Sequence, residues 1–597
     1  MSASTGVLRI DEAFLGPRAL PPPPTRHALF AIVIALAALI HLGSIGIGDL
    51  YSETEGQYAA AAREMLQSGH LLMPTNDSIP RLQKPPLLYW LIIASYKLFG
   101  VNAAAARVPI ALSVVVTTAL TFVIGERLRD YWRGFSAAMI YLTCSGTFVL
   151  ARIVMPEPLF SALIAGAIYC ALAGFQQRKQ RLAWFAGFWI CAALACLTKG
   201  PHGLLVPACT VALLAIFYRE ARIRFRPLLR WPYLVLFALM VAPWNIWMET
   251  HFRGSFHSLI FSEWTKHLIG RYPDGTWFDD VPRLEFALNH LGWWFPWSFV
   301  VLPALLFAWP RVMRPREISF EDALPLAWAA VVFIPALLIG QRQDYYALSM
   351  FSAFALCAAM IFERAPNGLR YAGAICVAVF GALLAVIALV LPALLPAHDR
   401  TWGETDFRWT AWKALGDMPV STWANFRPLL FVSALGFIGG AFLCLYTLRR
   451  GRENVALAGL AAGMIAAGLC MISGVARVAP YFSLADAARL LNARLGANGE
   501  VLFEGPPGIA SSLGFYLQRP FALVNQQPDP RLPLTPEQRD LFLEQNAALE
   551  QWRSPRPVFL IIEQDRVGHW RELLTDKFHV YHQVATSGTY VILCNQM

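Results

Sequence analysis

A succession of long apolar runs constrains this chain more than any other feature of its sequence. A membrane-spanning helix needs about 20 apolar residues, with a range of roughly 17–25, and the chain contains about 13 runs near this length. Hydrophobic residues make up 57% of the sequence and charged residues only 15%, whereas a soluble domain carries about 25% charged residues. The sequence therefore predicts an all-α polytopic membrane protein. The predicted spans are 28–47, 108–124, 134–150, 158–175, 183–198, 203–217, 231–249, 291–309, 323–340, 345–362, 370–392, 428–447 and 455–472.

The charges between the runs predict the orientation in the membrane. If the N-terminus is cytoplasmic, the loops on its side include the basic segments ERLRDYWRG and YREARIRFRPLLR. The short loops of the other side carry one basic residue each, namely Arg152, Lys199 and Arg342. Cytoplasmic loops hold most of the Lys and Arg in multi-pass proteins. An odd number of spans then places the C-terminal tail in the periplasm. These loops account for the net charge of +10, so nucleic acid is not a predicted partner.

The sequence divides into three regions. Residues 1–27 form a cytoplasmic N-terminal tail, which contains acids and four consecutive prolines and does not resemble a cleaved signal peptide. Residues 28–475 form the transmembrane domain, with interfacial helices expected within 48–107. In that segment, ETEGQYAAAAREMLQSG predicts an amphipathic helix that ends at Gly69, and PPLLYWLIIASYKLFG predicts a short apolar helix in the membrane interface.

The tail, residues 476–597, predicts a small periplasmic α/β domain. Short apolar segments such as EVLFEG, PVFLIIEQ and GTYVILCN alternate with helical ones such as FSLADAARLLNARLG and RVGHWRELLTDKF. The segment EGPPGIAS lacks the Gly-Lys-Ser/Thr ending of a phosphate-binding loop. Most of the 10 Cys lie inside apolar runs, which predicts neither a disulfide framework nor a CxxC metal site.

The polar residues that could carry chemistry lie on the predicted periplasmic side. They come from segments far apart in the chain, so the prediction depends on their meeting at one face of the membrane. The candidates are Glu53, Glu55, Tyr58, Lys84, Glu157, Lys199, His267, Arg271, Arg342, Tyr345 and Tyr346.

Each candidate also has a purely structural interpretation. The segment SETE fits a capping box, with Ser52 as N-cap and Glu55 at the third helical position. Lys84 precedes two prolines and could extend along the membrane interface. Glu157 would complement the positive end of a helix, and Lys199 would lie at a helix C-terminus. The segments EWTKHLIGRYPDG and GQRQDYYALS could be ordinary loops.

Several motifs in their order resemble one known family. The segments TEGQYAAAAREMLQSGHLLMP, LQKPPLLYWLIIASYKLFGVNAAAARVP, ARIVMPEPLF, LTKGPHGLLVP, FSEWTKHLIGRY and WWFPWSFVVLP together resemble the bacterial aminoarabinose (4-amino-4-deoxy-L-arabinose) transferases. Those enzymes are GT-C glycosyltransferases related to the protein O-mannosyltransferases. The resemblance runs from about residue 28 to residue 450, and the tail is also similar to that family's periplasmic domain.

The resemblance implies a GT-C fold and a polyprenyl (undecaprenyl) phosphate sugar as donor. It also implies transfer at the periplasmic face of the bacterial inner membrane, onto a lipid A-type or other lipid or glycan acceptor. The family's Asp-Glu-x-x-Tyr motif corresponds to Thr54, Glu55 and Tyr58, and its Glu-Lys-Pro motif begins with Gln83 and Lys84. The two missing acids weaken the case for a metal site built on them, and for lipid A as acceptor. A divalent metal ion is left open as a cofactor, with no residue assigned to bind it.

Roles for the matching residues follow from the resemblance together with the chemistry. Lys84 and Arg342 would stabilise the departing phosphate. If the acceptor is a hydroxyl, Glu55 or Glu53 would take its proton, with Glu157 as the second choice. The residues expected to bind the donor phosphate or sugar are Arg342, Tyr346, Tyr345, Lys199, His267, Arg271 and Tyr58.

Two other classes of protein remain as alternatives. A lipid or sugar transporter or flippase would favour ionisable residues in the middle of its helices and inverted repeats, which the sequence does not display. A non-catalytic envelope assembly protein would explain the altered acids. The chain is expected to act as a monomer among membrane lipids.

Overall fold

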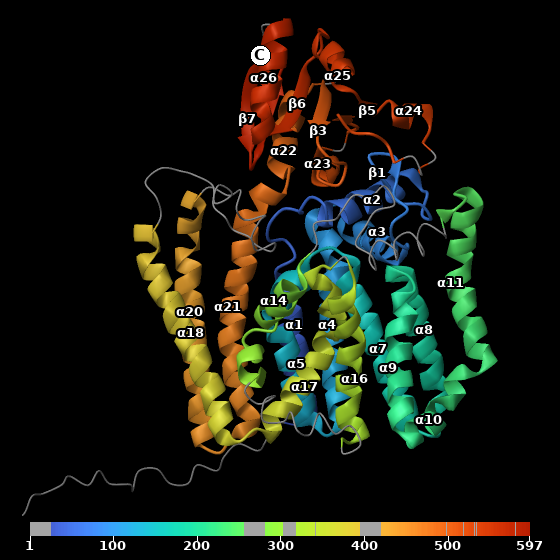
Figure 1. Ribbon diagram of the computed structural model, residues 1–597, viewed down its shortest axis with the longest axis vertical. Helices are drawn as coiled ribbons and strands as arrows, with labels where there is room; N and C mark the ends of the chain where they lie inside the picture. The colour runs from blue at the N-terminus through green and yellow to red at the C-terminus, as the bar shows by residue number, and fades with distance from the viewer. Residues whose placement is uncertain are drawn as a thin grey trace, which may run out of the picture.

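The protein is described here by a computed structural model in which an apolar helical bundle carries a small α/β domain at one end (Figure 1). The structure describes residues 25–255, 281–302, 318–340, 342–394 and 420–596, apart from 497, 518, 530, 531, 533, 579 and 580. The helices of the bundle region are α1 (Arg26–Gly43), α2 (Glu55–Ser68), α3 (Leu87–Phe99), α4 (Ala103–Leu128), α5 (Tyr131–Thr143), α6 (Ser145–Val149), α7 (Pro156–Gln176), α8 (Arg181–Lys199), α9 (His202–Phe217), α10 (Arg219–Phe225), α11 (Trp231–His251), α14 (Arg283–Trp293), α16 (Phe320–Leu338), α17 (Phe351–Arg364), α18 (Asn367–Leu394), α20 (Arg427–Arg449) and α21 (Glu453–Phe482), with the 3-10 helices η2 (Leu150–Arg152) and η6 (Asp344–Met350).

The prediction of a polytopic membrane protein is confirmed. Within the described ranges, ten helices are long and apolar enough to cross a membrane, and each coincides with one of the predicted spans. The predicted span 134–150 is broken: α5 and the segment that follows it are bent by 60°. The predicted span 203–217 is the 16-residue helix α9, and the predicted span 291–309 lies partly outside the described residues, as do residues 1–24 of the N-terminal tail.

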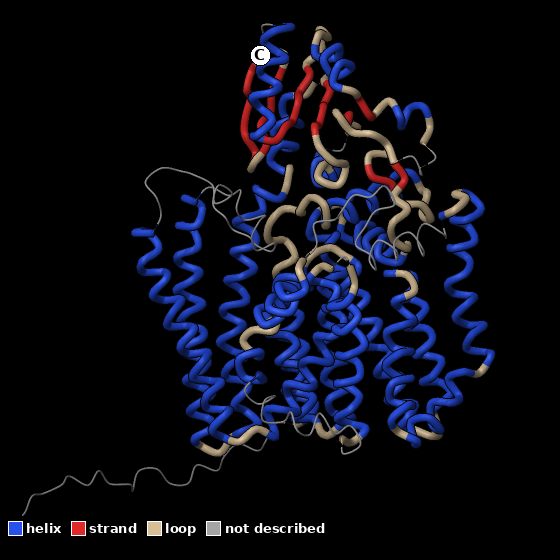
Figure 2. The backbone as a smooth tube through the Cα atoms, in the orientation of Figure 1, coloured by secondary structure: helices blue, strands red, loops and turns tan. Residues whose placement is uncertain are grey.

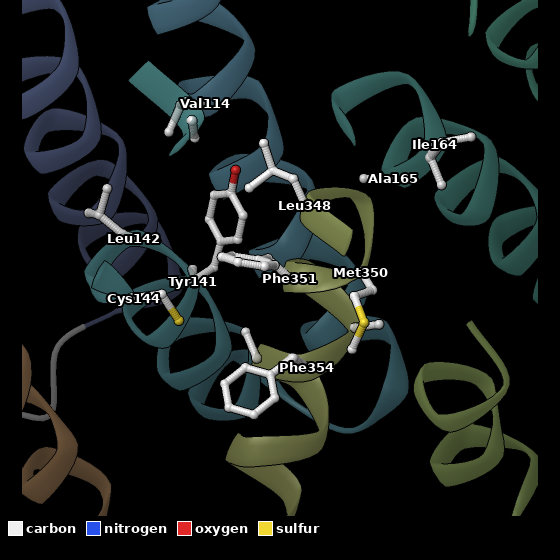
Figure 3. Packing of buried hydrophobic residues seen from close by; sticks show 14 of the residues in the cluster. Val114, Tyr141, Leu142, Cys144, Ile164, Ala165, Leu348, Met350, Phe351 and Phe354 are labelled. Carbon is white, nitrogen blue, oxygen red and sulfur yellow. The ribbon is translucent and has the colours of Figure 1, made fainter. Parts of the chain in front are cut away.

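The core of the bundle is formed by α4, α5, α7 and α17, whose buried side chains interlock (Figure 3). Tyr141 and Phe351 lie at its centre and are almost fully buried.

The close packing of α20 and α21 depends on glycine instead of large side chains. A methyl group on Gly440 would lie 2.8 Å from the Gly459 carbonyl oxygen and 3.0 Å from the Gly463 Cα. Small residues allow such backbone approach between membrane helices.

A layer made of α2, the strands β1 (Thr75–Asn76) and β2 (Ile79–Pro80), and α3 lies between the bundle and the C-terminal domain (Figure 1). The amphipathic helix and the short apolar helix predicted here are both present, and α2 ends at Gly69 in the left-handed conformation. The predicted capping box is wrong. Thr54 is the N-cap residue without a side-chain cap, and the Glu55 carboxylate instead accepts a hydrogen bond from the Tyr51 N–H at 3.1 Å.

The predicted C-terminal α/β domain is confirmed as a six-stranded mixed sheet with strand order β5-β4-β3-β6-β8-β7 (Figure 2). The strand β3 pairs in parallel with β4 and β6, and β8 pairs antiparallel with β6 and β7. The expected boundary at residues 475 and 476 falls near the end of α21. The elements are α22 (Ala485–Arg494), β3 (Glu500–Glu504), α23 (Ser511–Leu517), β4 (Ala522–Val524), α24 (Pro536–Arg539), β5 (Phe542–Leu543), α25 (Gln545–Trp552), β6 (Val558–Glu563), α26 (Val567–Phe578), β7 (His582–Ser587) and β8 (Tyr590–Cys594).

The alternation of side chains along the strands gives this sheet two cores. On β3, Val501 and Phe503 pack on the face covered by α22 and α23, whereas Leu502 packs on the face covered by α25 and α26. Successive residues of a strand point to opposite faces, so an uninterrupted apolar strand needs helices on both sides.

The domain is fastened directly to the loop that precedes α2. Ser52 Oγ and Ser512 Oγ are 2.6 Å apart, and the Glu53 N–H donates to the Gly508 carbonyl at 2.9 Å. Gly56 permits this approach, because a Cβ there would lie 2.6 Å from the Ser512 nitrogen. The C-terminal domain therefore helps to determine the position of the acidic segment that contains Glu53.

Asp77, in the turn between β1 and β2, makes this docking sensitive to pH. Burial and the nearby Glu64 carboxylate raise the pKa of Asp77 from an ordinary value of 3.8 to about 7. The pKa of Asp77 is higher in the folded state than in the unfolded state, so the proton on Asp77 stabilises the fold. This contribution is complete below about pH 4 and is lost as the pH rises through about 7.

Asp77→Asn should therefore raise the free energy of unfolding by about 1–2 kcal/mol more at about pH 8 than at about pH 5. Thermal unfolding of the purified chain at the two pH values measures this difference. The exposed Asp540→Asn is the control, and an equal effect of Asp77→Asn at both pH values would contradict the assignment.

Candidate active site

The polar candidates gather at the end of the bundle that faces the C-terminal domain. Glu53 precedes α2, Glu157 lies in the first turn of α7 and Lys199 is the last residue of α8. Tyr345 and Tyr346 lie in η6, which packs against α7. The polar residues thus lie at or beside the ends of helices, and three of them, Glu157, Lys199 and Tyr346, are in contact.

Glu55 is buried in an ion pair that fastens α2 to α4. Both carboxylate oxygens accept hydrogen bonds from Arg107, from Nε at 2.8 Å and from the second guanidinium nitrogen at 2.7 Å. The Val154 N–H donates to the same carboxylate at 3.2 Å. Burial alone would raise the pKa of Glu55, but the charge and hydrogen bonds of Arg107 and the Tyr51 N–H hold that pKa below its ordinary value. This geometry fits a residue that positions the start of α2.

Removal of Arg107 should therefore destabilise the protein. Its guanidinium also donates to the carbonyls of Gly48 at 2.7 Å and Asp49 at 2.9 Å. We expect Arg107→Ala to cost about 3–5 kcal/mol, because it leaves the Glu55 carboxylate charged, buried and unpaired. Thermal unfolding in detergent measures the loss. The exposed ion pair of Arg489 with Asp49 provides the control, since Arg489→Ala should cost at most about 1 kcal/mol. Equal losses for the two variants would contradict the structural role.

Glu53 differs from Glu55 in being exposed. Its backbone has a φ of 59°, in the left-handed region, which is strained for a residue with a side chain. It borders a pocket of about 470 Å³ that Tyr590 of the C-terminal domain also lines. Partial burial of its carboxylate raises the pKa of Glu53 above its ordinary value. A carboxylate that borders a pocket is placed to accept a proton from a bound hydroxyl.

Glu157 and Lys199 form an ion pair that was not predicted. Lys199 Nζ lies 3.0 Å from Glu157 Oε1, and the same ammonium lies over the Tyr346 ring at 4.7 Å from its centroid. Glu157 is buried and Lys199 half-buried. Each residue also has the helix-end position expected from the sequence. The pair therefore places one positive and one negative group side by side, with the Lys199 ammonium in contact with the Tyr346 ring.

Arg81 is a cation of this region that sequence reasoning missed. It donates from Nε to the Tyr89 hydroxyl at 3.0 Å and hydrogen-bonds Gln57, and its guanidinium lies 4.9 Å from the centroid of the Tyr58 ring. Burial raises the pKa of Tyr58 well above its ordinary value, so its hydroxyl stays protonated and can donate. The signal was present in the segment RLQKPP, where Arg81 lies three residues before Lys84.

Lys84 and Arg342 occupy different settings. Leu82 and Leu87, which flank Lys84, belong to an apolar cluster that includes Leu197, two residues before Lys199. The segment that carries Lys84 therefore packs near the end of α8. Arg342 is buried, and its Nε donates to the Val281 carbonyl at 2.9 Å while another guanidinium nitrogen bonds the Ile339 carbonyl. The guanidinium of Arg342 thus joins the segment before η6 to the residues before α14.

Two predicted site residues, His267 and Arg271, lie outside the described residues. Among the described residues, no group of three or more His, Cys, Asp or Glu side chains could hold a metal ion. The acids near the site do not supply such a group, because Glu55 is bound by Arg107 and Glu157 by Lys199. The described residues therefore do not fit a divalent metal ion.

The fold defines a class: a polytopic membrane protein with the GT-C fold. Residues 83–247 match the family described as dolichyl-phosphate-mannose-protein mannosyltransferase. The crystal structure of ArnT from Cupriavidus metallidurans bound to undecaprenyl phosphate superposes with a TM-score of 0.78, covering 95% of this chain and 98% of that chain at 19% identity. The apo structure of the same protein gives a TM-score of 0.76. These likenesses establish the fold.

More particularly, the chain is similar in sequence to aminoarabinose transferases. It is 24% identical over 384 residues to the undecaprenyl phosphate-alpha-4-amino-4-deoxy-L-arabinose arabinosyl transferase of Shewanella sediminis, covering 62% of this chain and 67% of that protein. The corresponding transferase 1 of Pseudomonas fluorescens is 26% identical over 403 residues, covering 64% and 66%. An uncharacterized protein of Aquifex aeolicus is 29% identical over 335 residues, covering 55% of this chain. The match spans 63% of that relative, less than two thirds of its length.

Proposed function

We propose that this protein is an integral-membrane glycosyltransferase that moves a sugar from a polyprenyl-phosphate donor to an envelope acceptor. The observation that carries the proposal is the Glu157–Lys199 ion pair over the Tyr346 ring. It lies close to the loop that carries Glu53, because the N–H of Val154, three residues before Glu157, donates to the carboxylate of Glu55. A donor with a prenyl tail needs a site at the level of the membrane surface, where apolar and charged groups are both available. The relatives named as undecaprenyl phosphate-linked arabinosyl transferases support the same class of donor.

The arrangement supports an assignment of roles. Lys84 and Lys199, at neighbouring segment ends, would bind the donor phosphate, because cations near developing phosphate charge lower the barrier to its departure. Arg342 and Arg81 would hold the segments around the site in place through their hydrogen bonds. Tyr345, Tyr346 and Tyr58 would contact the sugar. Glu53 would take the acceptor proton as the acceptor oxygen attacks the anomeric carbon. Direct displacement of the phosphate would invert the configuration of that carbon.

The orientation of the chain belongs to this proposal. Ser52 hydrogen-bonds Phe482, so the ends of α1 and α21 lie on the side of the C-terminal domain. The opposite end carries a basic cluster that includes Arg129, Arg133 and Arg370. Because cytoplasmic surfaces of membrane proteins are rich in such residues, the site and the C-terminal domain would face the periplasm of a bacterium, with the N-terminus in the cytoplasm. The proposal treats the chain as a monomer.

Mass spectrometry of a deletion strain tests the function. We expect an envelope lipid or glycan to lack one sugar, and the matching polyprenyl-phosphate sugar to accumulate on the periplasmic leaflet. The wild-type chain should restore the sugar, and a Glu53→Gln chain should not. Unchanged lipids and glycans would contradict the proposal. Accumulation of the donor on the cytoplasmic leaflet alone would instead indicate a flippase.

A further inference from the structure

The pocket beside Glu53 lies between three parts of the chain. One wall is the loop before α2. A second is formed by Val149 of α6, by Ile153 and by the end of α21. The third lies where β6 ends and β8 begins. Its volume of about 470 Å³ is in the range of small-molecule sites. Glu53 borders this pocket. Ile153, which also lines it, lies four residues before Glu157 of the polar cluster. The pocket and the proposed donor site are therefore adjacent.

The lining changes from apolar to polar across the pocket. Val149, Val475 and Val478 belong to helices of the membrane bundle and give one apolar side. Glu563 and Tyr590 belong to the C-terminal domain and give a polar side, where the Tyr590 hydroxyl donates to the Glu563 carboxylate at 3.1 Å. Such a gradient fits an amphiphile whose apolar part lies toward the bundle and whose polar head lies against the domain.

The charged residues that line the pocket determine which polar head group of an amphiphile it can bind. Its charged residues among the described part of the chain are two acids, Glu53 and Glu563, with no Lys, Arg or His. The nearby Arg152 is turned toward backbone carbonyls, donating to Ser44 at 2.7 Å and to Ile47 at 2.5 Å. Two carboxylates without a cation repel a phosphate, whereas carboxylates and tyrosine rings suit sugar hydroxyls, which can donate hydrogen bonds to them.

We propose that this pocket binds the acceptor, and that the acceptor presents a neutral sugar hydroxyl on an amphiphile and not a phosphate. This inference rests on the proposed glycosyltransferase function and names its acceptor class. The acceptor oxygen forms the new bond to the anomeric carbon and gives its proton to Glu53. The bond from that carbon to the phosphate oxygen breaks, and its electron pair leaves with the polyprenyl phosphate. Glu53 then returns the proton to water.

Photocrosslinking of the full-length chain in zwitterionic lipid nanodiscs tests the acceptor class. The two probes are an alkyl glucoside and an alkyl phosphate with the same diazirine-bearing chain. We expect the glucoside to label peptides covering 475–483 and 563–590 about tenfold more than the phosphate does. Glu563→Lys should narrow or reverse this preference, and Glu563→Gln, which still accepts from Tyr590, should reduce it. The control Glu572→Lys, on the exposed face of α26, should leave it unchanged.

Binding of undecaprenyl phosphate, measured on the same samples, separates this inference from the proposed function. Donor binding that survives in Glu563→Lys, together with a lost glucoside preference, supports both. Equal or stronger labelling of the pocket by the phosphate probe, or no labelling of the pocket by either probe, would overturn the acceptor assignment while leaving the donor site intact. Absence of undecaprenyl phosphate binding in the wild-type chain would instead count against the proposed function.

Discussion

Replacement of Glu53 by Gln is expected to lower the rate of sugar transfer by about 10²–10⁴-fold, the usual contribution of a general base. The change removes the proton acceptor but keeps the side-chain shape, so the left-handed backbone at residue 53 carries the same strain. Burial raises the pKa of Glu53, and the base acts in its ionised form. The wild-type rate should therefore rise with pH through a pKa above the ordinary value for Glu. The measurement is a pH profile of transfer by the purified chain.

A matched control variant distinguishes the role of Glu53 from the effect of removing a carboxylate elsewhere in the protein. Glu544→Gln, on the exposed surface of the C-terminal domain, should leave the rate unchanged. In Glu53→Gln, the residual rate should no longer follow the wild-type pH dependence. A Glu53→Gln rate within about threefold of wild type, with the same pH profile, would remove Glu53 from the chemistry.

Replacement of Lys84 by Ala is expected to lower transfer by about 10²–10³-fold, because a cation that stabilises charge on the departing phosphate acts mainly in the transition state. Lys84→Arg should retain part of the rate, since it keeps the charge with a different geometry. The measurement is transfer from a polyprenyl-phosphate sugar under single-turnover conditions, which reports the chemical step directly.

The control for Lys84 lies on the helix that follows it. Lys97 is exposed in the last turn of α3, so Lys97→Ala removes the same charge away from the site and should leave the rate unchanged. If Lys84→Ala lowered only the affinity for donor and left the single-turnover rate at saturation intact, Lys84 would bind the ground state without stabilising the departing phosphate.

The sequence alone predicts most of the architecture, because length and composition determine which segments can cross a membrane. The ten membrane-length helices of the described residues all coincide with predicted runs. The sheet domain follows from short apolar segments separated by helices. The bend between α5 and α6 was missed, since an apolar run has the same composition whether it is straight or broken at Cys144.

The site was harder to predict, because its partners are distant in the chain. The sequence places Glu157 and Lys199 on the same side, but only tertiary packing brings them to 3.0 Å. Glu55 fits a local capping motif equally well, and its actual partner, Arg107, lies 52 residues away. Arg107 could have been noticed as a charge beside an apolar run, where an ionised side chain requires a partner. The choice between Glu53 and Glu55 needed the geometry.

A structure of the full-length chain with undecaprenyl phosphate bound tests the central claim most directly. The claim is that residues far apart in the sequence form one phosphate-binding site at the end of the bundle that carries the C-terminal domain. We expect a phosphate oxygen within about 3.5 Å of Lys84 Nζ, with the prenyl chain along the bundle and Glu53 on the open side of the phosphate. A phosphate bound instead at the opposite end, in the pocket of about 240 Å³ that Arg129 and Arg370 line, would contradict the account.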